Sequence, residues 1–122
     1  MTTTTVTAAD PYNVPLSIYR NRGWNQTFQV SENGVPLDIS KDELALIVLA
    51  ESGMNIILSN TKPLVGSGAA SCSFVYSDIE TETLTANERY VWQFLRRPSG
   101  AVNSDLLTAG PLNVSESPPF PP

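Results

Sequence analysis

The chain offers few side chains that could carry out chemistry. Histidine is absent from all 122 residues, which removes the commonest general base and the commonest metal ligand. The single cysteine, Cys72, has no histidine to activate it and cannot form an intrachain disulfide or a cysteine-rich metal site. Because it alternates with serines, we expect it to pack as a small apolar residue. We therefore predict no catalytic residue, no metal site and no cofactor.

Carboxylates and a glycine-rich segment are the remaining candidates for chemistry. Asp42 and Glu43 are adjacent, and Glu80 and Glu82 are two residues apart. A glycosidase needs two carboxylates that face each other across a cleft, whereas these lie among polar residues, which favours a solvated surface. The glycines of residues 66–68 precede a predicted strand, whereas a phosphate-binding loop precedes a helix, which favours a flexible loop.

Two basic clusters stand out against an acidic background. The net charge of −5 and the pI of about 4.5 argue against a nucleic-acid partner, because binding phosphates needs a basic surface. Arg20 and Arg22 form one basic cluster, and Arg96 and Arg97 form the other. They are either solvated strand ends or contacts to an acidic patch on a neighbouring subunit.

Four aromatic residues support two different interpretations. Trp24, Tyr90, Trp92 and Phe94 could form an exposed platform on which sugars stack, which would indicate a carbohydrate-binding module. Their alternation with other residues at period two favours burial in a core instead.

Strands are the elements that must position these residues. The segment Trp24 to Val30 alternates between an apolar and a polar face, and Asn33-Gly34 after it is a strong hairpin signal. Pro36 makes the segment Val35 to Ile39 an edge. The segment Leu44 to Ala50 is apolar on both faces, so it is a central strand or a buried helix, and its length and the Ile-Val pair favour a strand. Further strands are predicted at Asn55 to Ser59, Ala70 to Tyr76, Arg89 to Arg97 and Leu106 to Val114, the last interrupted by Gly110-Pro111.

These elements define the fold class. Ser77 and Glu80 have capping-box spacing, which predicts one short helical turn. About seven short strands at roughly ten-residue spacing are typical of an all-β antiparallel β-sandwich, which we place at residues 16–114. The start of the chain lacks the features of a signal peptide, and no apolar run approaches the roughly 20 residues of a membrane helix. We predict a soluble protein made in the cytoplasm.

The two ends of the chain lack periodicity. Residues 1–15 are threonine-rich and predict an extended N-terminal arm, and residues 115–122 predict a proline-rich, extended C-terminal tail. Alone, such segments are disordered, so we expect either neighbouring subunits or the chain's own domain to hold them. The predicted partner contacts are Thr2, Thr3, Thr4, Thr5 and Val6 at the N-terminal end, and Pro118, Pro119, Phe120 and Pro121 at the C-terminal end. We expect Phe120 to anchor the C-terminal tail to the partner.

The order of turns and core positions resembles a known group of domains. The features are Leu16-Ser-Ile-Tyr19, the Asn33-Gly34-x-Pro36-Leu37-Asp38-Ile39 turn, Tyr90-x-Trp92, and Leu106-Leu107-x-x-Gly110-x-Leu112-x-Val114. They resemble the immunoglobulin-like domains of bacteriophage structural proteins, and are similar to the N-terminal module of upper baseplate proteins and to small tail or head accessory proteins. The resemblance covers residues 16–114.

The resemblance implies a non-catalytic subunit of the virion. Such a subunit docks onto other virion structural proteins and is present in repeated copies or as a homo-oligomer, with no nucleic acid or membrane as partner. Baseplate proteins continue into further domains where this chain stops, so we expect an accessory subunit of the tail, baseplate or head. The alternative is a carbohydrate-binding module that contacts the host surface.

Overall fold

The computed structural model describes residues 2–7, 14–32, 34–61, 63–65 and 70–116. Within these residues almost every element is a strand, as the alternation predicts, and a single helix follows β8. The strands are β1 Thr2–Thr7, β2 Leu16–Tyr19, β3 Trp24–Glu32, β4 Val35–Pro36, β5 Glu43–Ala50, β6 Ile56–Asn60, β7 Leu64–Val65, β8 Ser71–Tyr76, β9 Arg89–Arg97 and β10 Asp105–Ser115, and the helix is α1 Asp78–Glu82.

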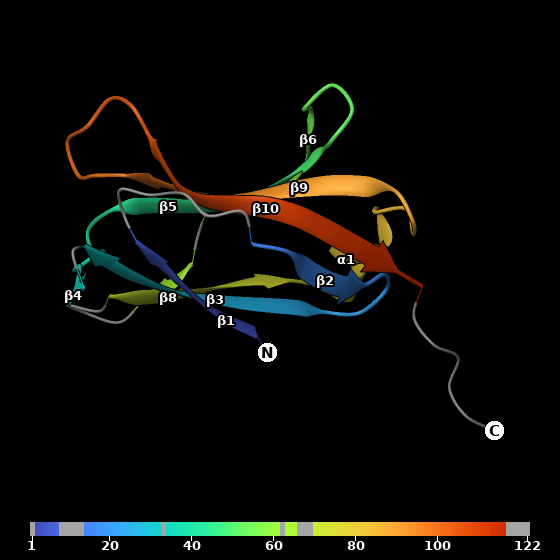
Figure 1. Cartoon of the computed structure of the whole chain (residues 1–122), viewed down its shortest axis with the longest axis horizontal. Helices are drawn as coiled ribbons and strands as arrows, with labels where there is room; N and C mark the ends of the chain where they lie inside the picture. Colours follow the sequence, from blue (N-terminus) through green and yellow to red (C-terminus); the bar gives the residue numbers. More distant parts are fainter. Residues whose placement is uncertain (1, 8–13, 33, 62, 66–69, 117–122) are drawn as a thin grey trace.

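The strands form two sheets that pack face to face (Figure 1). The first sheet has the order β1-β3-β8-β7, with β4 paired to the end of β3. The second sheet has the order β2-β10-β9-β5-β6. The predicted β-sandwich is confirmed. Most pairs are antiparallel, but β1 runs parallel to β3 and β2 runs parallel to β10.

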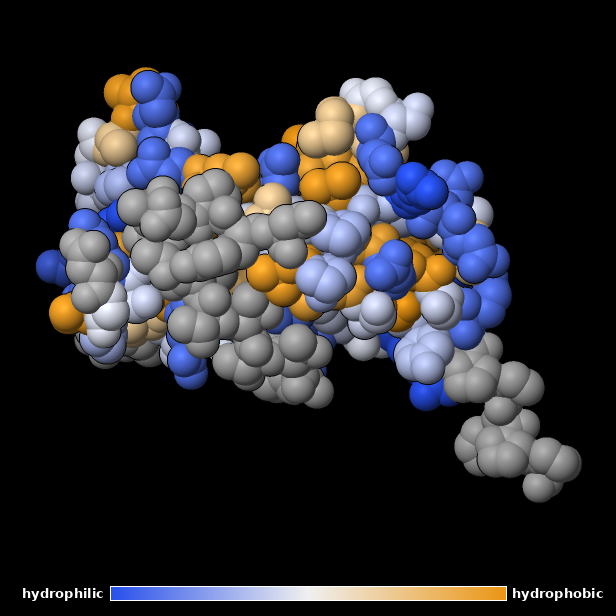
Figure 2. Space-filling model, in the orientation of Figure 1, coloured by the Kyte–Doolittle hydropathy of each residue, from blue (hydrophilic) through white to orange (hydrophobic). Residues whose placement is uncertain are grey.

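The outer side of the second sheet is hollowed between two raised ends. The β9–β10 connection, residues 98–104, rises at one end of the sheet, and the β5–β6 connection, residues 51–55, rises at the other (Figure 1). Figure 2 shows hydrophobic side chains on the floor between them. The two tips belong to different strand pairs, so they stand on opposite halves of the sheet.

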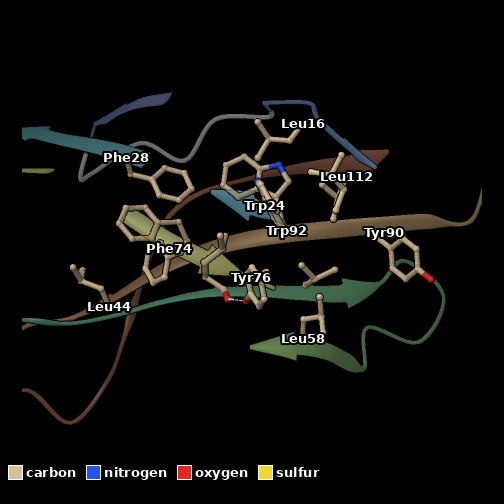
Figure 3. Close-up of a cluster of buried hydrophobic side chains, with 14 of the residues drawn as sticks. Leu16, Trp24, Phe28, Leu44, Leu58, Phe74, Tyr76, Tyr90, Trp92 and Leu112 are labelled. Carbon is tan, nitrogen blue, oxygen red and sulfur yellow. Dashed lines mark hydrogen bonds between the residues drawn. The ribbon is translucent and has the colours of Figure 1, made fainter. Parts of the chain in front are cut away.

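The core between the sheets is aromatic (Figure 3). The Phe28 and Phe94 rings stack at 4.2 Å, and Phe74 meets Phe94 edge-on at 5.8 Å. Trp92 is fully buried, and Trp24 is only 6% exposed. The prediction that the alternating aromatics form the core is confirmed, and the four that a sugar-stacking platform required are turned inward.

The predicted interruption of the last strand is wrong, because β10 continues through Gly110 and Pro111. The Ala109 carbonyl accepts a hydrogen bond from the Val14 N–H at 3.1 Å, so the peptide groups of alternate residues from Ala109 face the β2 side. Pro111 therefore turns its missing N–H towards that side, where β2 begins to pair only at Leu112. The proline removes no hydrogen bond to β9, and the strand can continue.

The short helix begins as the sequence predicts. The Ser77 hydroxyl accepts from the Glu80 N–H at 3.1 Å, and the Glu80 carboxylate accepts from the Ser77 N–H at 3.0 Å, which completes the capping box. The Asn33-Gly34 hairpin is also confirmed at β3–β4, where Gly34 has a φ of +78°. Asn33 itself lies outside the described residues.

Candidate functional site

The N-terminal contact residues lie in the domain's own sheet. The backbone of Thr2, Thr3, Thr4, Thr5 and Val6 forms most of β1, which pairs with β3 over six residues. The segment is extended, as expected. We expected either a neighbouring subunit or the chain's own domain to hold it, and its backbone pairs with the chain's own domain. Contact with a neighbouring subunit stays a prediction. At the other end of the chain, Pro118, Pro119, Phe120 and Pro121 lie outside the described residues.

The two arginine clusters do not form one basic surface. β10 pairs with Arg96 at its first residue, Asp105, and with Tyr19 at its last, Ser115. The clusters therefore lie at opposite ends of an 11-residue strand, which at about 3.3 Å per residue spans about 33 Å from its first to its last Cα atom. A single acidic patch on a small partner cannot meet both clusters.

Each described arginine cluster also has a role within the domain. Arg96 donates to the Asp42 carboxylate at 2.5 Å, in a largely buried pair, and Arg97 pairs with Glu43 at the surface. The Arg20 guanidinium donates to the Leu84 carbonyl at 2.8 Å, and the Arg22 guanidinium lies 5.9 Å from the centre of the Tyr19 ring. These contacts hold the C-terminal end of β9 and the β2–β3 turn in place. That the arginines also contact a partner stays a prediction.

The candidates for chemistry have structural surroundings. The Glu80 carboxylate caps α1, and Asp42 and Glu43 pair with arginines, so these carboxylates do not face one another across a cleft. Burial raises the pKa of the Cys72 thiol to about 12, which keeps it protonated and unreactive. Within the described ranges, no group of three acidic or cysteine side chains lies where it could hold a metal ion.

Sequence reasoning missed an apolar surface on the outside of the second sheet. Ile47 and Leu49 of β5 are only 8% and 6% exposed, yet neither belongs to the core cluster, which takes Leu44, Leu46 and Val48 from the same strand. Because side chains alternate across a sheet, Ile47 and Leu49 point outward. The signal was present in the segment Leu44 to Ala50, which is apolar on both faces although only one face meets the core.

The neighbouring strands extend this surface. The register places Val91 opposite Leu49, Gln93 opposite Ile47, and Leu95 opposite Ala45. We call these six residues the apolar face. On β10, Pro111 and Ala109 continue its rows, and on β6 the 59% exposed Ile56 pairs with Leu49. Ala45, Val91 and Leu95 are half-buried, and accessible apolar surface that is rimmed by polar groups is typical of an interaction site.

A hollow opens at one end of the apolar face. It has a volume of about 230 Å³ and is lined by Ala45, Leu95, Thr61, Ser104 and the Glu43–Arg97 pair, with Leu44 beneath. The lining combines an apolar floor with charged and hydroxyl groups at the rim. A pocket that accepts one side chain of a partner protein has the same kind of lining. Among the residues that the structure describes, the aromatic Tyr19 is exposed and lies at the other end of the molecule.

Comparisons with known proteins identify a similar fold. The chain superposes on the N-terminal domain of phage TP901-1 ORF48 with a TM-score of 0.61, over 94% of this chain and 100% of that domain, at 13% sequence identity. No family model matches the sequence, and no curated protein matches it. In the described part of the chain, no helix is long and apolar enough to span a membrane.

Proposed function

We propose that the chain is a non-catalytic structural module of a bacteriophage particle, which docks onto other virion proteins. The observation that carries this proposal is the fold likeness to the ORF48 domain, which extends over the whole of that domain and nearly the whole of this chain. A match over nearly the full length of both chains indicates that they share one architecture. Because fold alone does not define function, the proposal also rests on the surface.

The strand order supports an immunoglobulin-like assignment. In such sandwiches one sheet has the order A-B-E-D and the other contains G, F and C, with C′ added in variable-type domains. With β3, β8 and β7 as strands B, E and D, and β10, β9, β5 and β6 as strands G, F, C and C′, the strand orders match these sheets. The first strands depart from the pattern, because β1 runs parallel to β3 and β2 runs parallel to β10. The Tyr90 hydroxyl accepts from the Thr85 N–H at 2.8 Å, which corresponds to the tyrosine corner at the start of strand F. Phe28 and Trp92, with ring centres 5.6 Å apart, lie on the strands that carry the disulfide in antibody domains.

The surface supports docking more than catalysis. The apolar face is flanked by ion pairs and raised hairpin tips, whereas the Asp42, Glu43 and Glu80 carboxylates make structural contacts and the thiol of Cys72 is buried. The carbohydrate-binding alternative needed an exposed row of aromatic side chains, and Trp24, Tyr90, Trp92 and Phe94 are in the core. We therefore favour a subunit of the tail, baseplate or head over a sugar-binding module.

Deletion of the gene tests the proposal. When the gene for this chain is deleted from the phage genome, the other virion proteins should still be produced. The particles should then lack a defined density in electron microscopy and should lose infectivity. Supplying the chain from a plasmid should restore the density and infectivity. Normal particles with full infectivity in the absence of the chain would contradict a structural role.

A further inference from the structure

We infer that the apolar face docks onto the same face of a second copy of this chain, with a twofold axis that runs along the strands between β5 and β9. The inference rests on the proposed docking role and names one partner for it. Its starting point is the pattern of outward-facing residues. Along β9 these residues are Arg89, Val91, Gln93, Leu95 and Arg97, so that a charge at each end encloses an apolar stretch with an amide at its centre.

β5 carries the complementary pattern. Its outward residues from Glu43 are Ala45, Ile47 and Leu49, and Glu51 follows the strand. Glu43 pairs with Arg97 at one end, and the Glu51 carboxylate lies 3.9 Å from the Arg89 guanidinium at the other. The apolar rows are thus closed at both ends by an acidic residue on the β5 side and a basic residue on the β9 side.

This charge arrangement selects one symmetry. Two copies that meet through one face are related by a twofold axis in the plane of the interface. An axis across the strands would keep β9 over β9 and place Arg97 over the second copy's Arg89, so that like charges meet. An axis along the strands places β9 over β5, so that Arg97 meets Glu43 of the second copy at one end and Arg89 meets Glu51 at the other. Opposite charges then alternate around both ends, which favours this register.

The raised hairpin tips are compatible with the same axis. One tip stands on the β9–β10 half of the sheet and the other on the β5–β6 half (Figure 1). Rotation about an axis along the strands exchanges these halves. Each tip therefore lies beside the corresponding tip of the second copy, not on top of it, and the hollow that Figure 2 shows faces that of the second copy.

The size of the face predicts a reversible dimer. Four strands about 4.8 Å apart, over about six residues of 3.4 Å each, give a floor of roughly 400 Å² per copy. Stable complexes bury about 800 Å² per partner, so the floor alone lies below that size and the tips must supply the rest. We expect a monomer–dimer equilibrium that depends on concentration.

Sedimentation velocity of the full chain, from about 5 to about 500 μM, tests the inference. The wild-type chain should shift from monomer to dimer over this range. Val91→Lys, on β9 next to the central Gln93, should raise the dissociation constant at least about tenfold, because it places a charge in the apolar part of the interface. Val75→Lys is the matched control, since Val75 is an exposed valine on the outer side of the first sheet. It should leave the equilibrium unchanged.

Two outcomes of this experiment would overturn the inference. One is a wild-type chain that stays monomeric over the whole range, which would leave the face to a different partner. The other is a dimer that Val75→Lys disrupts and Val91→Lys does not. Thermal unfolding of both variants verifies that they are folded, so that loss of dimer is not loss of structure.

Cysteine cross-linking tests the axis without placing a charge in the interface. Gln93→Cys and Ile47→Cys chains, when mixed and oxidised, should form a disulfide dimer, because the axis along the strands places these residues over each other. Gln93→Cys alone should form little. Efficient cross-linking of Gln93→Cys alone would overturn the assigned axis. Buried Cys72 does not compete. Both experiments use the purified chain and no phage particles. A negative result would therefore disprove the dimer without testing the proposed role in the particle.

Discussion

At the residue scale, one glycine determines how the start of the domain meets its core. The Trp92 indole N–H donates to the Val14 carbonyl at 2.9 Å, and this carbonyl passes directly over Gly110. A Cβ atom at Gly110 would lie 1.8 Å from the Val14 oxygen, far inside van der Waals contact. Glycine is therefore required by the close approach of two backbones and not by a turn.

Gly110→Ala should destabilise the domain by about 3 kcal/mol, because it displaces Val14 and leaves the buried indole N–H of Trp92 unsatisfied. Denaturant unfolding, followed by the fluorescence of the two buried tryptophans, measures this loss. Gly23→Ala is the control, since its Cβ would lie at an ordinary 3.6 Å from the nearest atom, the Tyr76 carbonyl oxygen. It should change stability by less than about 1 kcal/mol. Equal effects of the two substitutions would contradict the account of Gly110.

Cys72 gives a prediction about pH. Burial raises the pKa of its thiol to about 12 in the folded chain, whereas the thiol has its ordinary pKa of 9.0 in the unfolded chain. Above pH 9 the unfolded state therefore binds fewer protons than the folded state, and stability falls as the pH rises. A thiol reagent at pH 8 should modify Cys72 only after denaturation, and the denaturant midpoint should decline from pH 9 to 11. Rapid labelling of the folded chain would show that Cys72 is exposed.

The sequence predicted the burial of some of these residues but not the long-range contacts of others. Burial of Cys72, Trp24 and Trp92 followed from alternation within a strand, because period two is a local property. The role of Gly110 could not be predicted, since the contact joins residues 96 positions apart in the sequence. The same limit hid the ion pair of Arg96 with Asp42, which only the pairing of β5 with β9 brings together.

At the scale of the element, α1 ties the corner between β8 and β9 to the rest of the domain. The Thr81 hydroxyl of the helix donates to the Arg22 carbonyl at 2.8 Å, and the Arg20 guanidinium reaches the Leu84 carbonyl just beyond it. The Thr85 N–H donates to Tyr90. A helix of five residues has little stability of its own, so its caps and these contacts maintain it.

Ser77→Ala should cost about 1 kcal/mol, because it removes the side-chain acceptor of the capping box. Thermal unfolding measures the loss. Ser17→Ala, at an exposed position of β2, should change the midpoint by no more than the experimental error. A neutral Ser77→Ala variant would mean that the tertiary contacts of Thr81 and Arg20 hold the corner without the cap.

β5 shows where the prediction of elements was right and incomplete. Its apolar residues on both faces correctly predicted a central strand, since β5 lies between β9 and β6. The same pattern is typical of a strand that is covered on both sides. In the single chain only one side meets the core, and the sequence could not say what covers the other.

At the scale of the whole molecule, removal of the C-terminal tail tests folding and assembly separately. The described structure ends at Glu116, after the last residue of β10, and the sandwich is complete at that point. Removing residues 117–122 should therefore leave the midpoint of thermal unfolding within about 2 °C of the wild type, while incorporation into particles falls. Normal incorporation of the truncated chain would rule out Pro118 to Pro121 as partner contacts.

The central claim, that the chain is a structural component of a phage particle, has one most direct test. Particles from a lysate of cells that produce this chain are purified on a density gradient, and their proteins are quantified by mass spectrometry. We predict that the chain co-purifies with intact particles in a fixed ratio to the other structural proteins. A chain that remains entirely in the soluble fraction, while intact particles lack it, would contradict the account.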